Sequence, residues 1–262
     1  VAGRETTLGV FPAGVDAGRF AALAQDPDVV AEAQAIRRDA GDRQIILGID
    51  RLDYTKGIPR RLAAVERLLA RGPSLRDRIR YIQVAVPARG AVESHQRFRR
   101  RVEERVGRIN GARGTNGAPV HYVHRSVSPR QLVALYRAAD VMLVTPLRDG
   151  MNLVAKEFVA SRVDGDGVLV LSEFAGAAAE LDGAVVVNPF DIDAVAASID
   201  RAVSMPVGAR RARMKGLRRS VTEHDINAWA DGFLAQLDAV RPFDPTPAVG
   251  RAEPCLLTAV AG

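Results

Sequence analysis

The stretch that decides the fold is "DVMLVTPLRDGMNLVAKEFVASR", residues 140–162, because it joins a buried strand to a helix. Its first seven residues, 140–146, form a short apolar run that does not alternate with polar residues. A continuous run of this kind is typical of a strand covered on both faces. From Met151 onward the apolar residues recur with helical spacing. The stretch therefore predicts a strand, a short polar loop and a helix.

The same unit recurs on both sides of this stretch. Strands are predicted at residues 44–50, 80–86, 120–124, 140–146, 167–173 and 184–189. Helices are predicted at residues 58–72, 91–107, 128–139, 151–162, 174–181 and 191–204. This repeated order predicts an α/β fold, with an open, doubly wound parallel sheet and right-handed crossovers. In such sheets ligands bind outside the carboxyl ends of the strands, so we look for function there.

Composition and charge exclude several classes of protein. With 47% apolar and 26% charged residues, the chain has the composition of an ordinary globular protein. Its net charge of +6 is carried largely by helical stretches without aromatic interleaving, so we expect no nucleic acid partner. Its apolar runs are too short to span a bilayer, so we expect no membrane partner. The one cysteine, Cys255, cannot form an intramolecular disulfide and favours a cytoplasmic location.

Two cations follow the first predicted strand, in "RLDYTKGIP", residues 51–59. Arg51 and Lys56 stand beside Gly57, and a helix is predicted to begin near Pro59. Arginine can hold two oxygens at once and lysine acts as a compact charge, so the pair suits a phosphate or diphosphate near a helix N-terminus. A surface cluster of Arg51, Asp53 and Lys56 with no ligand is an alternative that the spacing leaves open.

A single arginine follows the second predicted strand, in "VPARG", residues 86–90. Arg89 could hold a second anion, although loop arginines without a function are also common. His121 and His124 are three positions apart in the next strand and point to opposite faces, so they are no ligand pair. We therefore predict no metal site.

The loop after the fourth predicted strand has groups suited to a sugar. Asp149 accepts hydrogen bonds only, which suits hydroxyl groups, and Gly150 allows a close turn. The helix can begin only near residue 152, which would leave three amides as outward donors, those of Met151, Asn152 and Leu153. Glu157 could accept from ribose hydroxyls, and Lys156 is either a further cation or a partner for Asp149. A capping Asp before an ordinary amphipathic helix remains the alternative.

Together, "RLDYTKGIP", "VPARG" and "TPLRDGMNLVAKEF" resemble the motifs of trehalose-6-phosphate synthases. These retaining glycosyltransferases move glucose from a nucleotide-glucose donor, such as UDP-, GDP- or ADP-glucose, to glucose 6-phosphate. The resemblance runs from about Leu8 to about Val240. It implies the Rossmann-like, carboxyl-terminal domain of a glycosyltransferase B fold, which binds the donor.

The resemblance also implies a role for each matching residue. Arg51 and Lys56 would bind the donor diphosphate, and Asp149 would bind hydroxyls of the transferred glucose; these three are the implied catalytic residues. Glu157 would bind the ribose, and Arg89 the phosphate of the acceptor. Four main-chain amides are implied for glucose and phosphate, those of Gly150, Met151, Asn152 and Leu153. The implied reaction is attack on the front face of the sugar, without a nucleophilic carboxylate, a metal or another cofactor.

The family's amino-terminal half has no counterpart in this sequence. We therefore interpret residues 1–22 as an entry strand or linker from that domain, 23–240 as the nucleotide-sugar-binding domain and 241–262 as a proline-rich tail. We expect this half to bind nucleotide without turnover, and the whole enzyme to be a homo-oligomer, as is common in the family.

Three other functions remain open. A glycogen synthase or sucrose-phosphate synthase type of transferase would share the sheet and the two cations. A non-catalytic domain that senses sugar nucleotides would share the fold. A nicotinamide dehydrogenase is disfavoured because no G-x-G-x-x-G follows the first strand, and "GRINGARG", residues 107–114, ends a helix.

Overall fold

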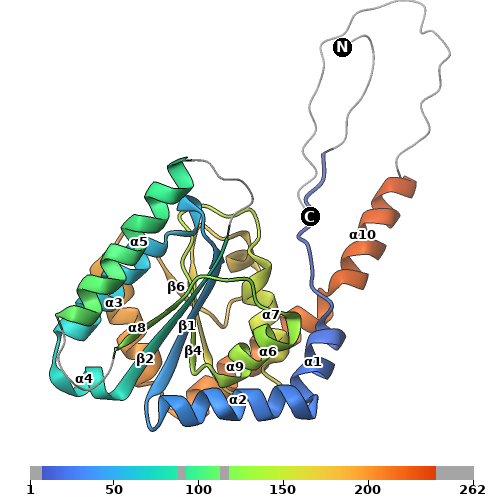
Figure 1. Cartoon of the computed structure of the whole chain (residues 1–262). Helices are drawn as coiled ribbons and strands as arrows, with labels where there is room; N and C mark the ends of the chain where they lie inside the picture. The colour runs from blue at the N-terminus through green and yellow to red at the C-terminus, as the bar shows by residue number, and fades with distance from the viewer. Residues whose placement is uncertain (1–7, 88–92, 113–117, 240–262) are drawn as a thin grey trace, which may run out of the picture.

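Six parallel strands form one sheet at the centre of the protein (Figure 1). The structure is a computed structural model that describes residues 8–87, 93–112 and 118–239. The strands are β1 (Gln44–Arg51), β2 (Ile79–Val86), β3 (Val120–Val123), β4 (Val141–Val144), β5 (Val168–Ser172) and β6 (Val185–Val187). Their order is β3-β2-β1-β4-β5-β6, and every neighbouring pair is parallel. The predicted doubly wound parallel sheet is confirmed.

Helices cover both faces of the sheet. On one face lie α1 (Ala17–Gln25), α2 (Pro27–Ala40), α6 (Pro129–Ala138), α7 (Leu153–Ser161) and α9 (Val207–Glu223). On the other lie α3 (Ile58–Ala70), α5 (Glu93–Gly111) and α8 (Ile192–Val203). Two short elements lie in connections: the 3-10 helix η1 (Tyr54–Lys56) joins β1 to α3, and α4 (Pro73–Arg78) joins α3 to β2. Each face of the sheet therefore has its own hydrophobic core.

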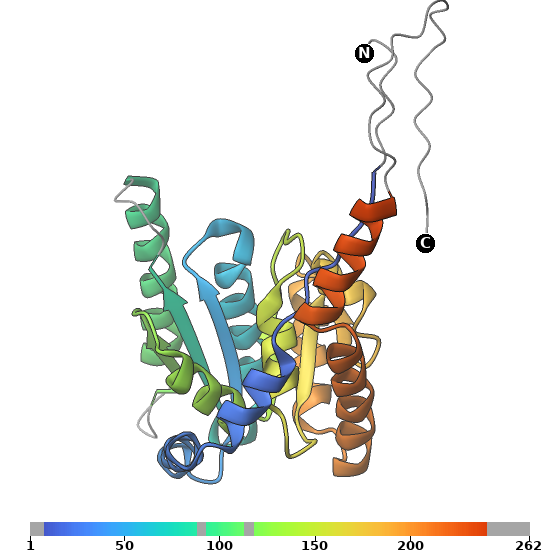
Figure 2. The same cartoon turned by 90° about the vertical axis from the view of Figure 1, so that its right-hand side faces the viewer.

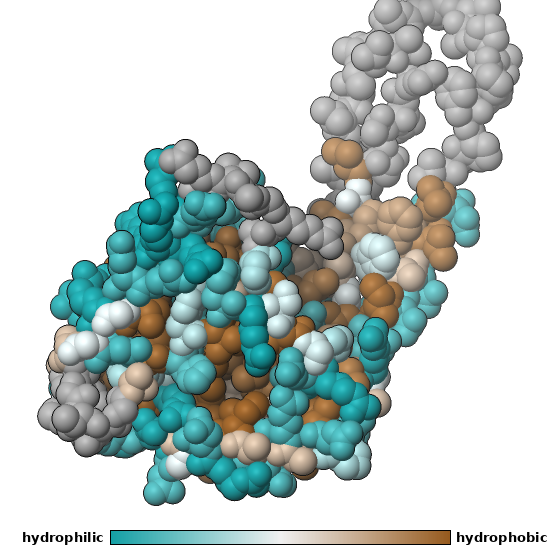
Figure 3. Space-filling model, in the orientation of Figure 1, coloured by the Kyte–Doolittle hydropathy of each residue, from teal (hydrophilic) through white to brown (hydrophobic). Residues whose placement is uncertain are grey.

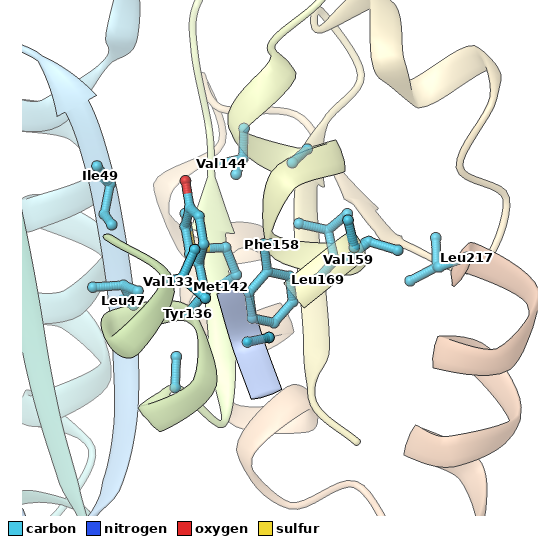
Figure 4. Packing of buried hydrophobic residues seen from close by; sticks show 14 of the residues in the cluster. Leu47, Ile49, Val133, Tyr136, Met142, Val144, Phe158, Val159, Leu169 and Leu217 are labelled. Carbon is cyan, nitrogen blue, oxygen red and sulfur yellow. The ribbon is translucent and has the colours of Figure 1, made fainter. Parts of the chain in front are cut away.

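The central strands are rich in apolar residues because successive side chains enter different cores. In β1, Ile45, Leu47 and Ile49 belong to the core under α6 and α7, whereas Ile46 belongs to the core under α3. Successive side chains of a strand point to opposite faces, so a strand that is buried on both sides needs apolar residues at consecutive positions. Figure 4 shows Leu47 and Ile49 in the first of these cores, together with Met142 and Val144 of β4.

The strand order reverses between β1 and β4. The chain moves from β1 outward through β2 to β3, then returns to place β4 on the other side of β1. The connections that leave the carboxyl ends of β1 and β4 therefore lead to opposite faces of the sheet, into α3 and α7. Ligands of open α/β sheets bind at such a topological switch point.

All six predicted strands and five of the six predicted helices are confirmed, and one helix is wrong. Residues 174–181 form no α-helix; they contain the 3-10 helix η2 (Gly176–Ala179). Residues 9–16 of the predicted entry segment have no regular secondary structure, and α1 begins at Ala17. In the described part of the chain, no helix combines the length and the apolar character needed to cross a bilayer.

The final described helix, α10 (Ile226–Ala239), stands away from the body of the protein (Figure 2). The indole of Trp229 donates to the carbonyl of Phe11 at 3.1 Å, and the rings of Phe11 and Phe233 lie 5.1 Å apart. Figure 3 shows apolar surface on this helix, where Phe233, Leu234 and Leu237 are exposed. The base of α10 is thus held by residues that precede α1.

Candidate active site at the switch point

The turn after β1 places Lys56 at the carboxyl edge of the sheet. The side chain of Asp53 caps η1 by accepting from the amide of Thr55 at 2.9 Å. Gly57 follows with φ 68°, a backbone conformation that favours glycine. A Cβ atom at Gly57 would lie 2.6 Å from the carbonyl oxygen of Thr145. Glycine therefore lets the turn lie directly against the end of β4.

Lys56 and Asp149 form an ion pair across the switch point. The Nζ atom of Lys56 lies 2.5 Å from Oδ2 of Asp149, and the two side chains are 15% and 14% exposed. The backbone also joins the two loops, since the amide of Leu147 donates to the carbonyl of Thr55 at 2.7 Å. The structure therefore brings together two residues that the sequence placed after different strands.

Asn152 shapes the loop that carries Asp149. Its backbone has φ 72°, the one positive φ of a non-glycine residue among those described. Its side chain donates to Oδ2 of Asp149 at 3.0 Å and accepts from the amide of Ala155 at 3.3 Å. Asparagine tolerates left-handed backbone geometry better than most residues and also caps helices well. Asn152 thus begins α7 and holds the Asp149 carboxylate at the same time.

The backbone amides at the start of α7 point away from protein acceptors. In the part of the chain described here, the amides of residues 150–153 donate no hydrogen bond to the protein. The first amides of a helix have no partner within the helix, and they carry partial positive charge. These donors, next to Asp149, can bind hydroxyl or phosphate oxygens.

A second loop, after β5, fixes the Asp149 loop from the other side. The amide of Gly176 donates to the carbonyl of Asp149 at 3.1 Å, and the amide of Asp149 donates to the carbonyl of Phe174 at 3.1 Å. A Cβ atom at Gly176 would lie 2.0 Å from the carbonyl oxygen of Gly150. The sequence contained a signal for this packing, because Gly176 interrupts the predicted helix.

An open hollow of about 410 Å³ lies between these two loops. Asp149, Gly150 and Arg148 line it on one side, and Glu173, Phe174 and Gly176 on the other. The hollow combines two carboxylates, backbone groups and one aromatic ring, which are groups that a sugar-binding site can use. Arg51, Lys56 and Glu157 do not line this hollow.

Arg51 is exposed at the end of β1. Among the described residues its guanidinium makes no hydrogen bond or ion pair. Its charge still acts on the turn: burial raises the pKa of Asp53, but the hydrogen bonds from Thr55 and the charges of Arg51 and Lys56 lower it overall. The donors of Arg51 are therefore exposed at the carboxyl edge of the sheet.

Glu157 lies on the second turn of α7 and is held from α6. The hydroxyl of Tyr136 donates to Oε2 of Glu157 at 2.8 Å. Burial raises the pKa of the Glu157 carboxyl, and the hydrogen bond from Tyr136 offsets part of that effect. No contact joins Glu157 to Lys56 or Asp149 in the described residues, so it is a separate part of the site.

Comparison with known proteins places the chain in a family. The model of glycosyltransferase family 20 matches residues 1–239. The chain belongs to glycosyltransferase family 20. The predicted resemblance to trehalose-6-phosphate synthases is confirmed by relatives with that name: that of Mycobacterium tuberculosis (strain CDC 1551 / Oshkosh) is 50% identical over 241 residues, which are 91% of this chain and 48% of the relative. The enzyme of Mycobacterium leprae is 48% identical over a similar span. This chain thus spans about half the length of the curated relatives it matches.

Solved structures of the family have the same fold. A UDP-forming alpha,alpha-trehalose-phosphate synthase from Burkholderia xenovorans, in complex with glucose-6-phosphate, is 40% identical with a TM-score of 0.84, over 88% of this chain and 51% of that one. A structure from E. coli bound with UDP-2-fluoro glucose is 40% identical with a TM-score of 0.85, over 90% and 52%. Both likenesses agree with the predicted glycosyltransferase B type of domain.

Of the residues that the sequence placed at the site, Lys156 needs a correction and Arg89 lies outside the described part of the chain. Lys156 is neither a further cation of the site nor a partner for Asp149, because it is buried and pairs with Glu180 at 2.9 Å. It also donates to the carbonyl of Ala13 at 2.9 Å, so it fixes the segment before α1. The predicted acceptor role of Arg89 stays a prediction.

The structure also contains a buried polar cluster beneath the site, which was not predicted from the sequence. Arg61 of α3 is buried and forms an ion pair with Asp50 at the end of β1. It also donates to Oγ1 of Thr145 at 2.8 Å and to the carbonyl of Lys56 at 3.2 Å. A Cβ atom at Gly48 would lie 2.8 Å from Nη1 of Arg61. Arg61 therefore ties the Lys56 turn to the ends of β1 and β4, and the glycine in mid-strand was the signal for it.

Proposed function

We propose that this chain is the carboxyl-terminal, donor-binding half of a retaining trehalose-6-phosphate synthase. The enzyme transfers glucose from a nucleotide-glucose donor to glucose 6-phosphate. The observation that carries the proposal is the Lys56 and Asp149 pair at the switch point, next to free amides at the start of α7. Family membership and the names of the relatives support it. UDP-glucose is the donor we favour, because one relative is called UDP-forming and another holds a UDP sugar.

Each site residue receives a role in this proposal. Arg51 and Lys56 bind the diphosphate, Asp149 accepts from hydroxyls of the transferred glucose, and Glu157 accepts from the ribose. The four amides of residues 150–153 donate to sugar and phosphate oxygens. Arg89 binds the phosphate of the acceptor. Two features support this division of roles. The two cations lie at and just after the end of β1, and the carboxylate and the amides lie at the start of α7.

The reaction proceeds on one face of the sugar. The acceptor hydroxyl forms a bond to the anomeric carbon as the bond to the diphosphate breaks, and a phosphate oxygen that is leaving takes the hydroxyl proton. Negative charge grows on the diphosphate in this step. Arg51 and Lys56 stabilise that charge, an electrostatic effect worth about 3 to 4 kcal/mol for one donor in comparable sites. This is why we count both among the catalytic residues.

An assay of the complete protein tests the function. We expect trehalose 6-phosphate from UDP-glucose and glucose 6-phosphate, with retained configuration at the anomeric carbon by NMR. Fructose 6-phosphate and a glycogen oligosaccharide serve as competing acceptors, and GDP- and ADP-glucose as competing donors. Product from fructose 6-phosphate or glycogen, and none from glucose 6-phosphate, would contradict the proposal.

The proposal extends to the chain alone and to its assembly. The 262 residues by themselves should bind UDP in a calorimeter but form no product, because most of the acceptor contacts belong to the other half of the proposed enzyme. Turnover by this chain alone would contradict that division. We further propose a cytoplasmic homo-oligomer, which fractionation and light scattering of the complete protein would check.

A further inference from the structure

We propose that Tyr136 is a positioning residue, which orients the Glu157 carboxylate toward the ribose hydroxyls of the donor. The inference rests on the proposed function. Tyr136 lies on α6 and Glu157 on α7, so the hydrogen bond of 2.8 Å between them fixes the carboxylate from outside its own helix. A glutamate side chain has several rotatable bonds, and ordering it in advance removes part of the entropy cost of binding.

The hydroxyl of Tyr136 is a fixed donor. Burial raises the pKa of Tyr136 well above its usual range, and the Glu157 carboxylate raises it further. The hydroxyl therefore keeps its proton, and the ring is fully buried with the Phe158 ring at 6.2 Å in an edge-on contact. The guanidinium of Arg162 donates to the carbonyl of Tyr136 at 3.1 Å and holds the backbone. Little freedom is left to the donor.

The position of the hydroxyl places Glu157 at the switch point. Figure 4 shows the ring of Tyr136 in the core, with its oxygen directed toward the end of the sheet where Ile49 and Val144 lie. Ile49 is two residues before Arg51, and Val144 is the last residue of β4. The Glu157 carboxylate is thus held near the ends of β1 and β4, on the face of the sheet that α7 covers.

The bond leaves part of the carboxylate available. Tyr136 donates to Oε2, and within the described residues no donor reaches Oε1 of Glu157. An ionised carboxylate accepts about four hydrogen bonds. Burying such a group is costly unless it is paired, and no cation pairs with Glu157 among the described residues. A neutral side chain here would serve stability alone better than a half-buried carboxylate does, so we look to a ligand for its purpose.

The test compares two nucleotides in the complete protein. Calorimetry measures the affinities of UDP and of 2′,3′-dideoxyuridine diphosphate, which lacks both ribose hydroxyls. In the parent protein UDP should bind more tightly. In Tyr136→Phe this preference should fall about tenfold, the equivalent of one charge-assisted hydrogen bond, while the affinity of the dideoxy nucleotide stays the same. A general structural defect would weaken both nucleotides equally.

Tyr122→Phe is the matched control. The Tyr122 hydroxyl is also buried, but it has no hydrogen-bond partner in the described part of the chain. Its removal should leave the preference for UDP unchanged. Because Tyr136→Phe keeps the ring, the fold should survive, and thermal unfolding of both variants checks this.

Glu157→Gln separates the two levels of the proposal. If Glu157→Gln leaves the preference for UDP intact, or if UDP does not bind the parent protein, the ribose role in the proposed function fails. If Glu157→Gln abolishes the preference and Tyr136→Phe leaves it at the parent value, only the positioning role of Tyr136 is overturned. In the double variant, Tyr136→Phe should add no further loss, whereas additive losses would also contradict the inference.

Discussion

Nζ of Lys56 lies 2.5 Å from Oδ2 of Asp149, and this ion pair joins the loops that follow β1 and β4. The same carboxylate oxygen accepts from Asn152, so Oδ2 has two donors, whereas Oδ1 accepts from no donor among the described residues. Lys56 has further N–H donors beyond the one that it gives to Asp149. Each partner of the pair can therefore bind substrate and hold the other in place at once.

Lys56→Ala tests the cation of this pair. We expect kcat to fall by roughly a hundredfold or more, because charge that grows on the diphosphate loses a fixed donor. The KM of glucose 6-phosphate should change little. Steady-state kinetics of the complete protein measures both. Arg67→Ala is the control, since Arg67 is an exposed cation of α3 that pairs with Asp193. An unchanged kcat in Lys56→Ala would remove it from the site.

Arg51→Lys tests whether the exposed guanidinium grips two oxygens. Lysine keeps the charge but loses the planar fork, so the affinity for UDP should fall by about tenfold. Stability should not change, since Arg51 makes no hydrogen bond or ion pair with the described residues. Calorimetry and urea unfolding separate the two effects. Equal UDP affinities for the parent and the variant would argue against a diphosphate role.

Arg61→Met tests the buried cluster beneath the turn. The change leaves Asp50 buried without its cation, and breaking such a pair costs about 3 to 5 kcal/mol. The free energy of unfolding in urea should fall by that amount, and Arg61→Met with Asp50→Asn should recover part of it. Arg67→Met, on the exposed face of the same helix, should cost less than about 1 kcal/mol. A loss in Arg61→Met no larger than in this control would contradict the assignment.

The proposed ribose role of Glu157 predicts that donor binding depends on pH. Burial raises the pKa of Glu157, so the folded protein binds this proton more tightly than the unfolded chain does. The group therefore favours folding below its unfolded pKa, and that contribution is lost as pH rises through the folded pKa. The charged form accepts best from ribose, so the affinity for UDP should fall on acidification, at a higher pH than an exposed glutamate would cause. Calorimetry from pH 7 down to about pH 5 should show this fall, and Glu157→Gln should flatten it.

Arg89→Ala tests the acceptor side, at a position outside the described residues. The KM of glucose 6-phosphate should rise, because the acceptor phosphate loses a charge-assisted contact. Hydrolysis of UDP-glucose in the absence of acceptor should stay at the parent rate. The reverse pattern, with hydrolysis lost and the acceptor KM kept, would place Arg89 on the donor instead.

Local patterns in the sequence predicted most of the fold. Each of the six apolar runs contains a strand, and the central ones are buried, because a strand covered on both faces needs apolar residues at consecutive positions. The helix caps Ser128 and Asp191 also depend on local sequence, since a cap involves groups three residues apart or fewer. The prediction of a helix at residues 174–181 was wrong for a physical reason. The backbone of this segment forms hydrogen bonds with the Asp149 loop, and these replace helical ones.

The sequence by itself determined which residues stand at the ends of the strands, and so which charges and amides reach the carboxyl edge. Only the tertiary structure decided which of them meet. Lys56 and Asp149 are 93 residues apart, and Arg61 and Thr145 are 84 apart. Such contacts depend on the order of the strands in the sheet, which no local period contains. For the same reason Lys156, expected at the site, is buried against Glu180 instead.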